Sequence, residues 1–200
     1  MQALKEWAIV CKALEEGIQI ILVRKGGILE YKDGFSVNHD KFLLYPTFEH
    51  QTKESLKPWY ANRLDVVMNG QPAEGINIIT CLAHVKHVKE DVDRLTLQKI
   101  GLHHVWSDQC VTARMDYNPK KPTTVMVLRV FRLINPIVLT VKPEWSGCKS
   151  WIAMDSLEPN DEHVEINGFD DRKNRLGIPA LDDTKFAEAE SDIMQVLDKA

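Results

Sequence analysis

The sequence predicts an α+β protein with a mixed, mostly antiparallel sheet and short helices. Short apolar runs rich in β-branched residues recur along the chain and favour strands. Capped or amphipathic segments lie between these runs and favour helices, and turns containing Gly or Pro separate the two kinds of segment. Because the expected strands are short and the expected helices are interspersed among them, we assign the chain to the α+β class.

The composition is that of an ordinary globular protein. Of the 200 residues, 44% are hydrophobic and 27% are charged, which excludes a disordered chain, a collagen-like fibre and a coiled coil. No apolar run approaches the roughly 20 residues that span a bilayer, and the N-terminus lacks the pattern of a secretory signal. We therefore expect a cytoplasmic protein without a membrane partner. No C-x-x-C pair occurs, so we expect buried thiols rather than a zinc ribbon or a disulfide framework for Cys11, Cys81, Cys110 and Cys148.

The first third of the chain holds three patterned segments. Residues 5–30 predict either a hairpin or a helix that leads into a strand, and the β-branched run 18–23 favours a strand. Residues 42–45 form a further apolar run, closed by a proline. Thr47 can then cap a helix that extends to about Lys57, since the proline that follows forbids continuation.

The middle of the chain predicts one strand and two helices. Residues 76–85 are largely apolar on both sides of an alternating pattern, which is typical of a strand buried on both faces. Residues 91–100 indicate a short helix that ends before a glycine. Ser107 can cap a second helix, which stops before Asn118 and its following proline.

The last third predicts two more strands and a final helix. The clearest strand is 124–133, and residues 137–141 predict another after a turn at Asn135 and Pro136. The polar stretch 155–180 indicates long loops. Residues 182–184 can cap an amphipathic helix whose inward residues are Phe186, Ala189, Ile193 and Leu197.

The domain organisation follows from two changes in composition. Residues 62–75 contain Gly and Pro and give the best boundary in the first half. We expect an N-terminal α/β segment at 1–70, a β-rich core at 71–155, and an acidic loop with a C-terminal helix at 156–200. These parts are expected to pack as one compact unit.

The charge is unevenly distributed along the chain. Residues 151–200 hold five basic and thirteen acidic residues, a formal charge of −8, whereas the first 150 residues carry +4. A mildly basic body with an acidic tail is compatible with a nucleic-acid or phosphate partner. Two solvated surfaces of different composition explain the same numbers.

Several cationic side chains lie where an anion can approach. Arg24 and Lys25 follow an expected strand and precede two glycines, so their side chains and nearby N–H groups can contact a phosphate together. The spacing matches neither a Walker loop nor a dinucleotide fingerprint, and an exposed glycine turn is the alternative. Arg114 is a further expected phosphate contact. Trp106 and Trp151 can stack a base, although tryptophans more often occupy the core.

Two arginines fall within the most apolar expected strand. Arg129 and Arg132 point to opposite faces, and a buried guanidinium needs a carboxylate, a cluster of carbonyls or a bound anion. An ion pair with Glu144 or Asp116 is the structural explanation. A nucleic-acid contact on the surface of the sheet is the functional one.

Four acidic and histidine residues are the candidates for catalysis. Glu49 and His50 begin an expected helix, and His104 lies close to Asp108. Together they can supply an acid, a base or metal ligands. Neither pair has metal-ligand spacing, so we predict no metal site and favour hydrogen-bonded structural histidines.

Several segments occur in a characteristic order along the chain: Glu6-Trp7, Arg24 to Ile28 with Glu30, residues 42–51, His104 to Trp106, Lys121-Pro122, residues 128–130 and residues 147–151. Together they resemble an uncharacterised bacterial family, a domain of unknown function that occurs in cyanobacteria and bacilli. The resemblance covers about residues 3–155 and implies no activity, so it transfers no catalytic role.

Residues 75–142 are also similar in pattern to PUA-like domains, which contain a small β-barrel. Their succession of strand, short helix and strand ends at the turn Asn135 to Leu139. This resemblance implies a small barrel in the second half of the chain and a basic, aromatic-lined cleft that binds RNA or modified bases. The long N-terminal segment and the acidic tail depart from the PUA-like pattern.

These observations leave three functions open. We rank first the binding of RNA, DNA or a nucleotide, with phosphate held by Arg24, Lys25, Arg114 and Arg129 and a base stacked on Trp106 or Trp151. The second is a metal-dependent hydrolase or nuclease that uses Glu49, His50, His104 and Asp108, with Arg129 stabilising developing charge. The third is a non-catalytic interaction protein that uses its acidic tail.

Overall fold

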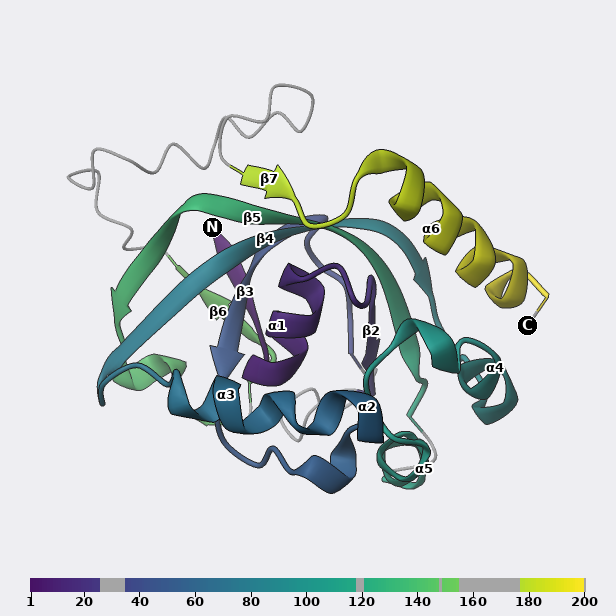
Figure 1. Cartoon of the computed structure of the whole chain (residues 1–200), viewed down its shortest axis with the longest axis horizontal. Helices are drawn as coiled ribbons and strands as arrows, with labels where there is room; N and C mark the ends of the chain where they lie inside the picture. Colours follow the sequence, from purple (N-terminus) through teal and green to yellow (C-terminus); the bar gives the residue numbers. More distant parts are fainter. Residues whose placement is uncertain (26–34, 118–120, 148, 155–176, 200) are drawn as a thin grey trace.

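A strongly curved sheet organises the part of the chain that the structure describes. The structure is a computed structural model that describes residues 1–25, 35–117, 121–147, 149–154 and 177–199. Within these residues, seven strands pair in the order β2-β5-β4-β3-β1-β6, and β7 pairs with β5 (Figure 1). The strands are β1 (Gln2–Trp7), β2 (Ile21–Arg24), β3 (Lys41–Thr47), β4 (Ile76–Lys89), β5 (Thr124–Thr140), β6 (Trp151–Ala153) and β7 (Gly177–Pro179).

All pairings in the sheet are antiparallel except that of β1 with β3. The helices are α1 (Ala8–Glu15), α2 (Pro58–Ala61), α3 (Arg63–Asn69), α4 (Arg94–Lys99), α5 (Asp108–Asp116) and α6 (Asp183–Leu197), with short 3₁₀ helices η1 (Lys53–Ser55), η2 (Gly101–His103) and η3 (Pro143–Trp145). This confirms the predicted α+β class with a mixed, mostly antiparallel sheet. Every described helix is too short or too polar to cross a bilayer.

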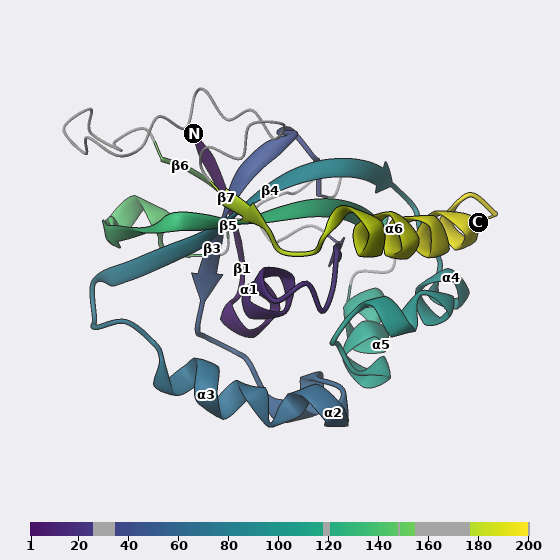
Figure 2. The ribbon, with the colours of Figure 1, turned by 45° about the horizontal axis from the view of Figure 1, so that its top comes forward.

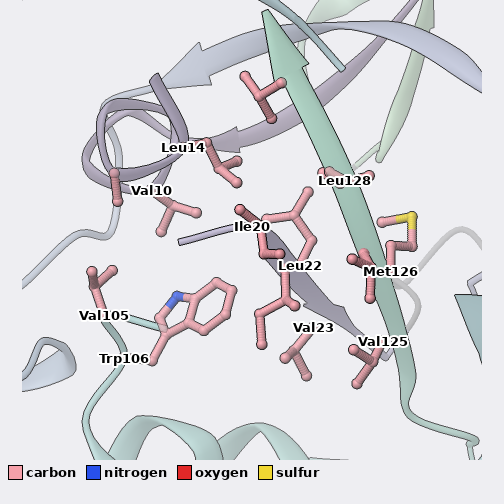
Figure 3. Close-up of a cluster of buried hydrophobic side chains, with 14 of the residues drawn as sticks. Val10, Leu14, Ile20, Leu22, Val23, Val105, Trp106, Val125, Met126 and Leu128 are labelled. Atoms are coloured by element: carbon pink, nitrogen blue, oxygen red, sulfur yellow. The ribbon is translucent and has the colours of Figure 1, made fainter. Parts of the chain in front are cut away.

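Helix α1 lies inside the curve of the sheet and forms much of the core (Figures 1 and 2). It contacts β1, β3, β4 and β5 as well as α3. Val10 and Leu14 on α1 pack with Leu22 on β2 and Met126 on β5, and all four side chains are fully buried (Figure 3). Burying a side chain of this size stabilises the fold by about 1.5–3 kcal/mol.

A second apolar cluster covers the other face of the sheet. It joins Leu43 of β3, Ile79 and Leu82 of β4 and Phe131 of β5 with Trp145 of η3. Central strand β4 is therefore buried on both faces in its middle, as the pattern of residues 76–85 predicts, and β5 is buried on both faces over its first half.

The sequence predicted some elements correctly. The segment predicted at residues 5–30 adopts the second of the two predicted arrangements over its described part, residues 5–25, since α1 leads into β2. The caps of two later helices are also confirmed: the side chains of Ser107 and Asp182 accept hydrogen bonds from backbone N–H groups at the starts of α5 and α6. The helix predicted over residues 91–100 begins at Arg94, where the side chain of Asp93 caps α4. The predicted loop 155–180 lies outside the described residues up to residue 176.

One predicted helix start was wrong. Thr47 does not cap a helix: it ends β3, and its hydroxyl donates to the Glu6 carbonyl at 3.1 Å. Helix α2 instead begins at Pro58, because a proline in the first helical turn needs no N–H acceptor. The predicted boundary 62–75 contains α3.

The predicted turn at Asn135 and Pro136 is a bulge inside one long strand. Ile79 of β4 pairs with Ile137, while Cys81 pairs with Arg132, so residues 133–136 of β5 lie opposite a single residue of β4. A bulged residue is left out of the ladder, so Pro136 interrupts no required hydrogen bond.

An ion pair joins the two ends of the curved sheet. Arg24 in edge strand β2 contacts the Glu6 carboxylate of β1 at 3.0 Å and donates to the Ser150 hydroxyl next to β6 at 2.8 Å. The Glu6 side chain is only 3% exposed and also accepts a hydrogen bond from the N–H of Trp7 at 2.8 Å. The sheet is therefore closed here by side chains rather than by a strand ladder.

We expect the substitution Arg24→Met to destabilise the protein by about 3 kcal/mol, because it leaves a buried carboxylate without its cation. Chemical denaturation measures this loss in the free energy of unfolding. The control is Lys53→Met, which removes an ion pair of 2.6 Å with Asp65 between side chains that are 45% and 63% exposed, and which should cost less than about 1 kcal/mol. Equal losses for the two variants would contradict the closing role of Arg24.

Gly17 links α1 to β2 in a conformation that only glycine fits well. Its φ is +68°, and a Cβ there would lie 2.7 Å from Leu181 Cγ and 2.9 Å from the Ala180 carbonyl oxygen. Gly75 also has a positive φ, +78°, but among the described residues its Cβ would meet no atom within 4 Å.

We expect Gly17→Ala to lower the free energy of unfolding by more than Gly75→Ala does. Both variants incur the left-handed penalty of about 1–2 kcal/mol, and only the first adds an overpacking cost of about 1–3 kcal/mol. Thermal and chemical denaturation of the two variants provide the comparison. Equal destabilisation would show that residues 180–181 do not crowd Gly17.

Candidate ligand-binding cleft

A cleft lies where β3 and β4 separate. Within the described ladder, the two strands pair only where Lys41–Leu43 of β3 lie opposite Leu82–His84 of β4. Further along β3, Pro46 has no N–H to donate, and the side chain of Asn77 bridges the gap by donating to the Pro46 carbonyl at 2.9 Å. A cleft of about 1090 Å³ lies beside this opening.

The cleft collects residues from distant parts of the sequence. The ends of β1, β2 and β3, the start of β4, helix α5 and the segment after η3 all contribute to its walls. Its five basic residues are Lys5, Arg24, Lys25, Arg114 and Lys149, and its acidic residues are Glu6, Glu49, Glu54 and Glu74. Both signs of charge therefore face the same space.

Backbone carbonyls accept hydrogen bonds from all of these cations. Lys25 donates to the Met115 carbonyl, Arg114 to the Val23 carbonyl at 3.2 Å, and Lys149 to the Glu144 carbonyl at 3.2 Å. Within the described chain, none of the three has a carboxylate oxygen within ion-pair distance, so their charges are not neutralised locally. Partial burial lowers the pKa of Lys25, and the charge of Asp116 opposes this shift.

Aromatic side chains line the same cleft. Trp7 is half-buried and lies beside Arg114, whose guanidinium carbon is 5.0 Å from the centre of the indole. Tyr45 and Trp145 form an edge-to-face pair with centroids 6.2 Å apart. Burial raises the pKa of the Tyr45 phenol, and Asn77 counteracts this through a hydrogen bond.

The structure brings together some of the predicted binding residues. Arg24, Lys25 and Arg114 all line the cleft. The sequence analysis missed Trp7 and Lys5, because nothing local indicates that the end of β1 faces the ends of β2 and α5.

Other predicted binding residues lie elsewhere. Trp106 is 1% exposed and belongs to the main core (Figure 3). Trp151 packs against Phe35 and Phe42, and its indole N–H donates to the Ser36 carbonyl at 3.1 Å. Neither tryptophan lines the cleft, so neither can stack a base there.

Arg129 is held by the C-terminal helix. Its guanidinium pairs with Asp183 and lies 4.6 Å from the centre of the Phe186 ring. The predicted partners Glu144 and Asp116 were wrong: Asp116 pairs with Arg94 instead. The buried charge of Arg129 is thus satisfied inside the protein and lies outside the cleft.

The four candidate catalytic residues do not converge. Glu49 and His50 line the cleft on the loop after β3, where His50 has a φ of 60°. The cleft lining does not include His104 or Asp108. The described residues also contain no group of three or more His, Cys, Asp or Glu side chains that could hold a metal ion.

His104 is a core residue beside Trp106. It is 2% exposed, and its ring centroid lies 5.4 Å from that of the indole. Burial lowers the pKa of His104 to about 4, and the charge of Lys57 adds to this shift. The imidazole is therefore neutral at pH 7 and requires no anion.

We expect the protein to lose stability as the pH falls from 7 to 5. A histidine whose pKa is depressed in the folded state takes up a proton on unfolding in this range, so its contribution is complete above pH 6.5 and is lost toward pH 4. The loss attributable to His104 should be about 1–2 kcal/mol at pH 5. Denaturation at both pH values should show a smaller decline for His104→Gln than for wild type and for the exposed control His50→Gln. Identical declines would exclude His104 as the cause.

Solved structures give distant similarities. The chain is similar to the crystal structure of ASCH from Zymomonas mobilis, with 12% sequence identity and a TM-score of 0.41 over 72% of this chain and 88% of that chain. A serine-to-alanine mutant of that protein gives 14% identity, a TM-score of 0.41 and coverages of 72% and 89%. A tyrosine-to-phenylalanine mutant gives 13% sequence identity and a TM-score of 0.40, over 72% of this chain and 91% of that chain. Similarity at this level assigns no function to the chain.

No curated protein matches the chain. A family model matches residues 3–191, which includes the segments that resemble an uncharacterised bacterial family and continues through most of α6. The chain therefore belongs to the family described as Domain of unknown function (DUF1802).

Proposed function

We propose that the protein binds a nucleic acid or a nucleotide in the cleft beside β3 and β4. One observation supports this most directly: Lys25, Arg114 and Lys149 line the same cleft as the half-buried indole of Trp7. Phosphate groups need cations whose charge is still available, and unpaired bases stack on exposed aromatic faces. The proposal assigns phosphate contacts to the cations and a base contact to Trp7.

The ion pairs of the cleft distinguish structural cations from binding cations. Arg24 is paired with the buried Glu6 carboxylate, so its charge stabilises the fold. Lys25 and Lys149 donate only to carbonyl oxygens among the described residues. A carbonyl orients an ammonium group but does not cancel its charge, so these two lysines can still attract a polyanion.

The acidic residues of the cleft limit the strength of this attraction. Glu49, Glu54 and Glu74 share the walls with the cations. We therefore expect moderate, salt-dependent affinity and not the tight non-specific binding of a strongly basic protein.

Fluorescence anisotropy with labelled pools of RNA and DNA oligonucleotides tests the proposal. Binding should weaken steadily as salt rises, because each neutralised phosphate releases counterions. The double variant Lys25→Glu/Lys149→Glu should bind about tenfold more weakly or worse at low salt, and its salt dependence should be smaller.

The matched control is Lys86→Glu/Lys99→Glu. It makes the same change in net charge at two exposed lysines that do not line the cleft. An equal loss for both double variants would indicate attraction by net charge alone and would remove the cleft from the proposal. Affinity that does not change with salt, or no binding at micromolar protein, would contradict nucleic-acid binding itself.

A further inference from the structure

We infer that Arg114 is a rigid, planar anchor for a phosphate-type oxyanion in the cleft. This deepens the proposed function and rests on it for the identity of the rest of the ligand. The planar arrangement of the N–H donors of Arg114, and not only its positive charge, selects the bound group.

Three contacts fix the guanidinium of Arg114. Its central carbon lies 5.0 Å from the ring centre of Trp7 and 4.8 Å from that of Trp106. Its Nη1 donates to the Val23 carbonyl of β2 at 3.2 Å. Trp106 is 1% exposed and cannot move without disturbing the core, so one of the two aromatic contacts is rigid.

These contacts hold the group without neutralising it. Indole rings attract a guanidinium through their electron-rich faces, and a carbonyl accepts one N–H, but neither carries a negative charge. Among the described residues, no carboxylate pairs with Arg114, and the Val23 carbonyl is its hydrogen-bond acceptor. The remaining N–H donors belong to a half-buried side chain that lines the cleft.

A planar fork of donors matches two oxygens of one oxyanion. Guanidinium groups bind carboxylates and phosphates through paired, parallel N–H···O bonds, a geometry that an ammonium group cannot reproduce. The two indole contacts and the Val23 carbonyl hold the guanidinium before a ligand arrives, so little side-chain freedom is lost on binding.

Lys25 supplies a second charge for the same group. Its ammonium donates to the carbonyl of Met115, the residue that follows Arg114 on α5. Strand β2 thus provides the carbonyl that Arg114 uses, and the residue that follows β2 is the neighbouring lysine. Two cations at the junction of β2 and α5 suit a phosphate, which carries more charge than a carboxylate.

The test compares Arg114→Lys and Arg114→Gln with wild type. Calorimetric titration uses inorganic phosphate, with chloride at equal ionic strength as the reference anion, and then a mononucleotide. Anisotropy uses the labelled oligonucleotide pool. We expect both variants to lose about tenfold or more in affinity for phosphate and nucleotide. The control is Arg94→Lys on α4, an exposed arginine that does not line the cleft.

A second measurement uses the wild-type protein and therefore does not depend on whether the variants fold. In the wild-type protein, the NMR signals of the Arg114 side-chain N–H groups should shift on addition of phosphate and not of chloride. Unchanged signals, or full affinity of a folded Arg114→Lys variant, would overturn the inference.

The outcomes separate the inference from the proposed function. If phosphate binds and depends on Arg114 but oligonucleotides do not bind, the inference stands and nucleic-acid binding fails. If oligonucleotides bind equally well to wild type and Arg114→Lys, nucleic-acid binding stands and the inference fails. If neither ligand binds, both fail.

Discussion

The buried ion pair between Glu6 and Arg24 determines how the two ends of the sheet meet. Charges of this kind are costly to desolvate, and the cost is offset only when their remaining hydrogen-bonding groups are satisfied. Here Arg24 also donates to the Lys5 carbonyl and the Ser150 hydroxyl, and Glu6 also accepts the N–H of Trp7. Because Lys5, Trp7 and Ser150 all line the cleft, the same pair shapes the candidate site.

The predicted anion-binding arginines have three different kinds of partner. Arg24 uses an internal carboxylate, Arg129 uses Asp183 at the start of α6, and Arg114 uses two indoles and a carbonyl. The expectation that cations in apolar strands have partners was sound on physical grounds. Sequence alone could not decide between a partner inside the protein and one outside it, since Asp183 is 54 residues from Arg129.

Features that depend on residues close together in the sequence were predicted better than features that depend on distant residues. The caps at Ser107 and Asp182 depend on neighbours three residues away, and both are confirmed. Strand β1 was missed as a separate element because Gln2–Trp7 runs directly into the apolar helix α1. The cleft could not be predicted, because it depends on β3 and β4 pairing over only part of their length.

The positions of the cysteines allow the cleft to be labelled selectively at one thiol. Burial raises the pKa of Cys11 well above its ordinary value and that of Cys81 to about 12, so both resist alkylation near neutral pH. Cys110, in contrast, is half-buried on the first turn of α5 and lines the cleft one helical turn before Arg114. With Cys148 replaced by serine, a small maleimide dye would attach at Cys110, and occupancy of the cleft could be followed directly by its emission.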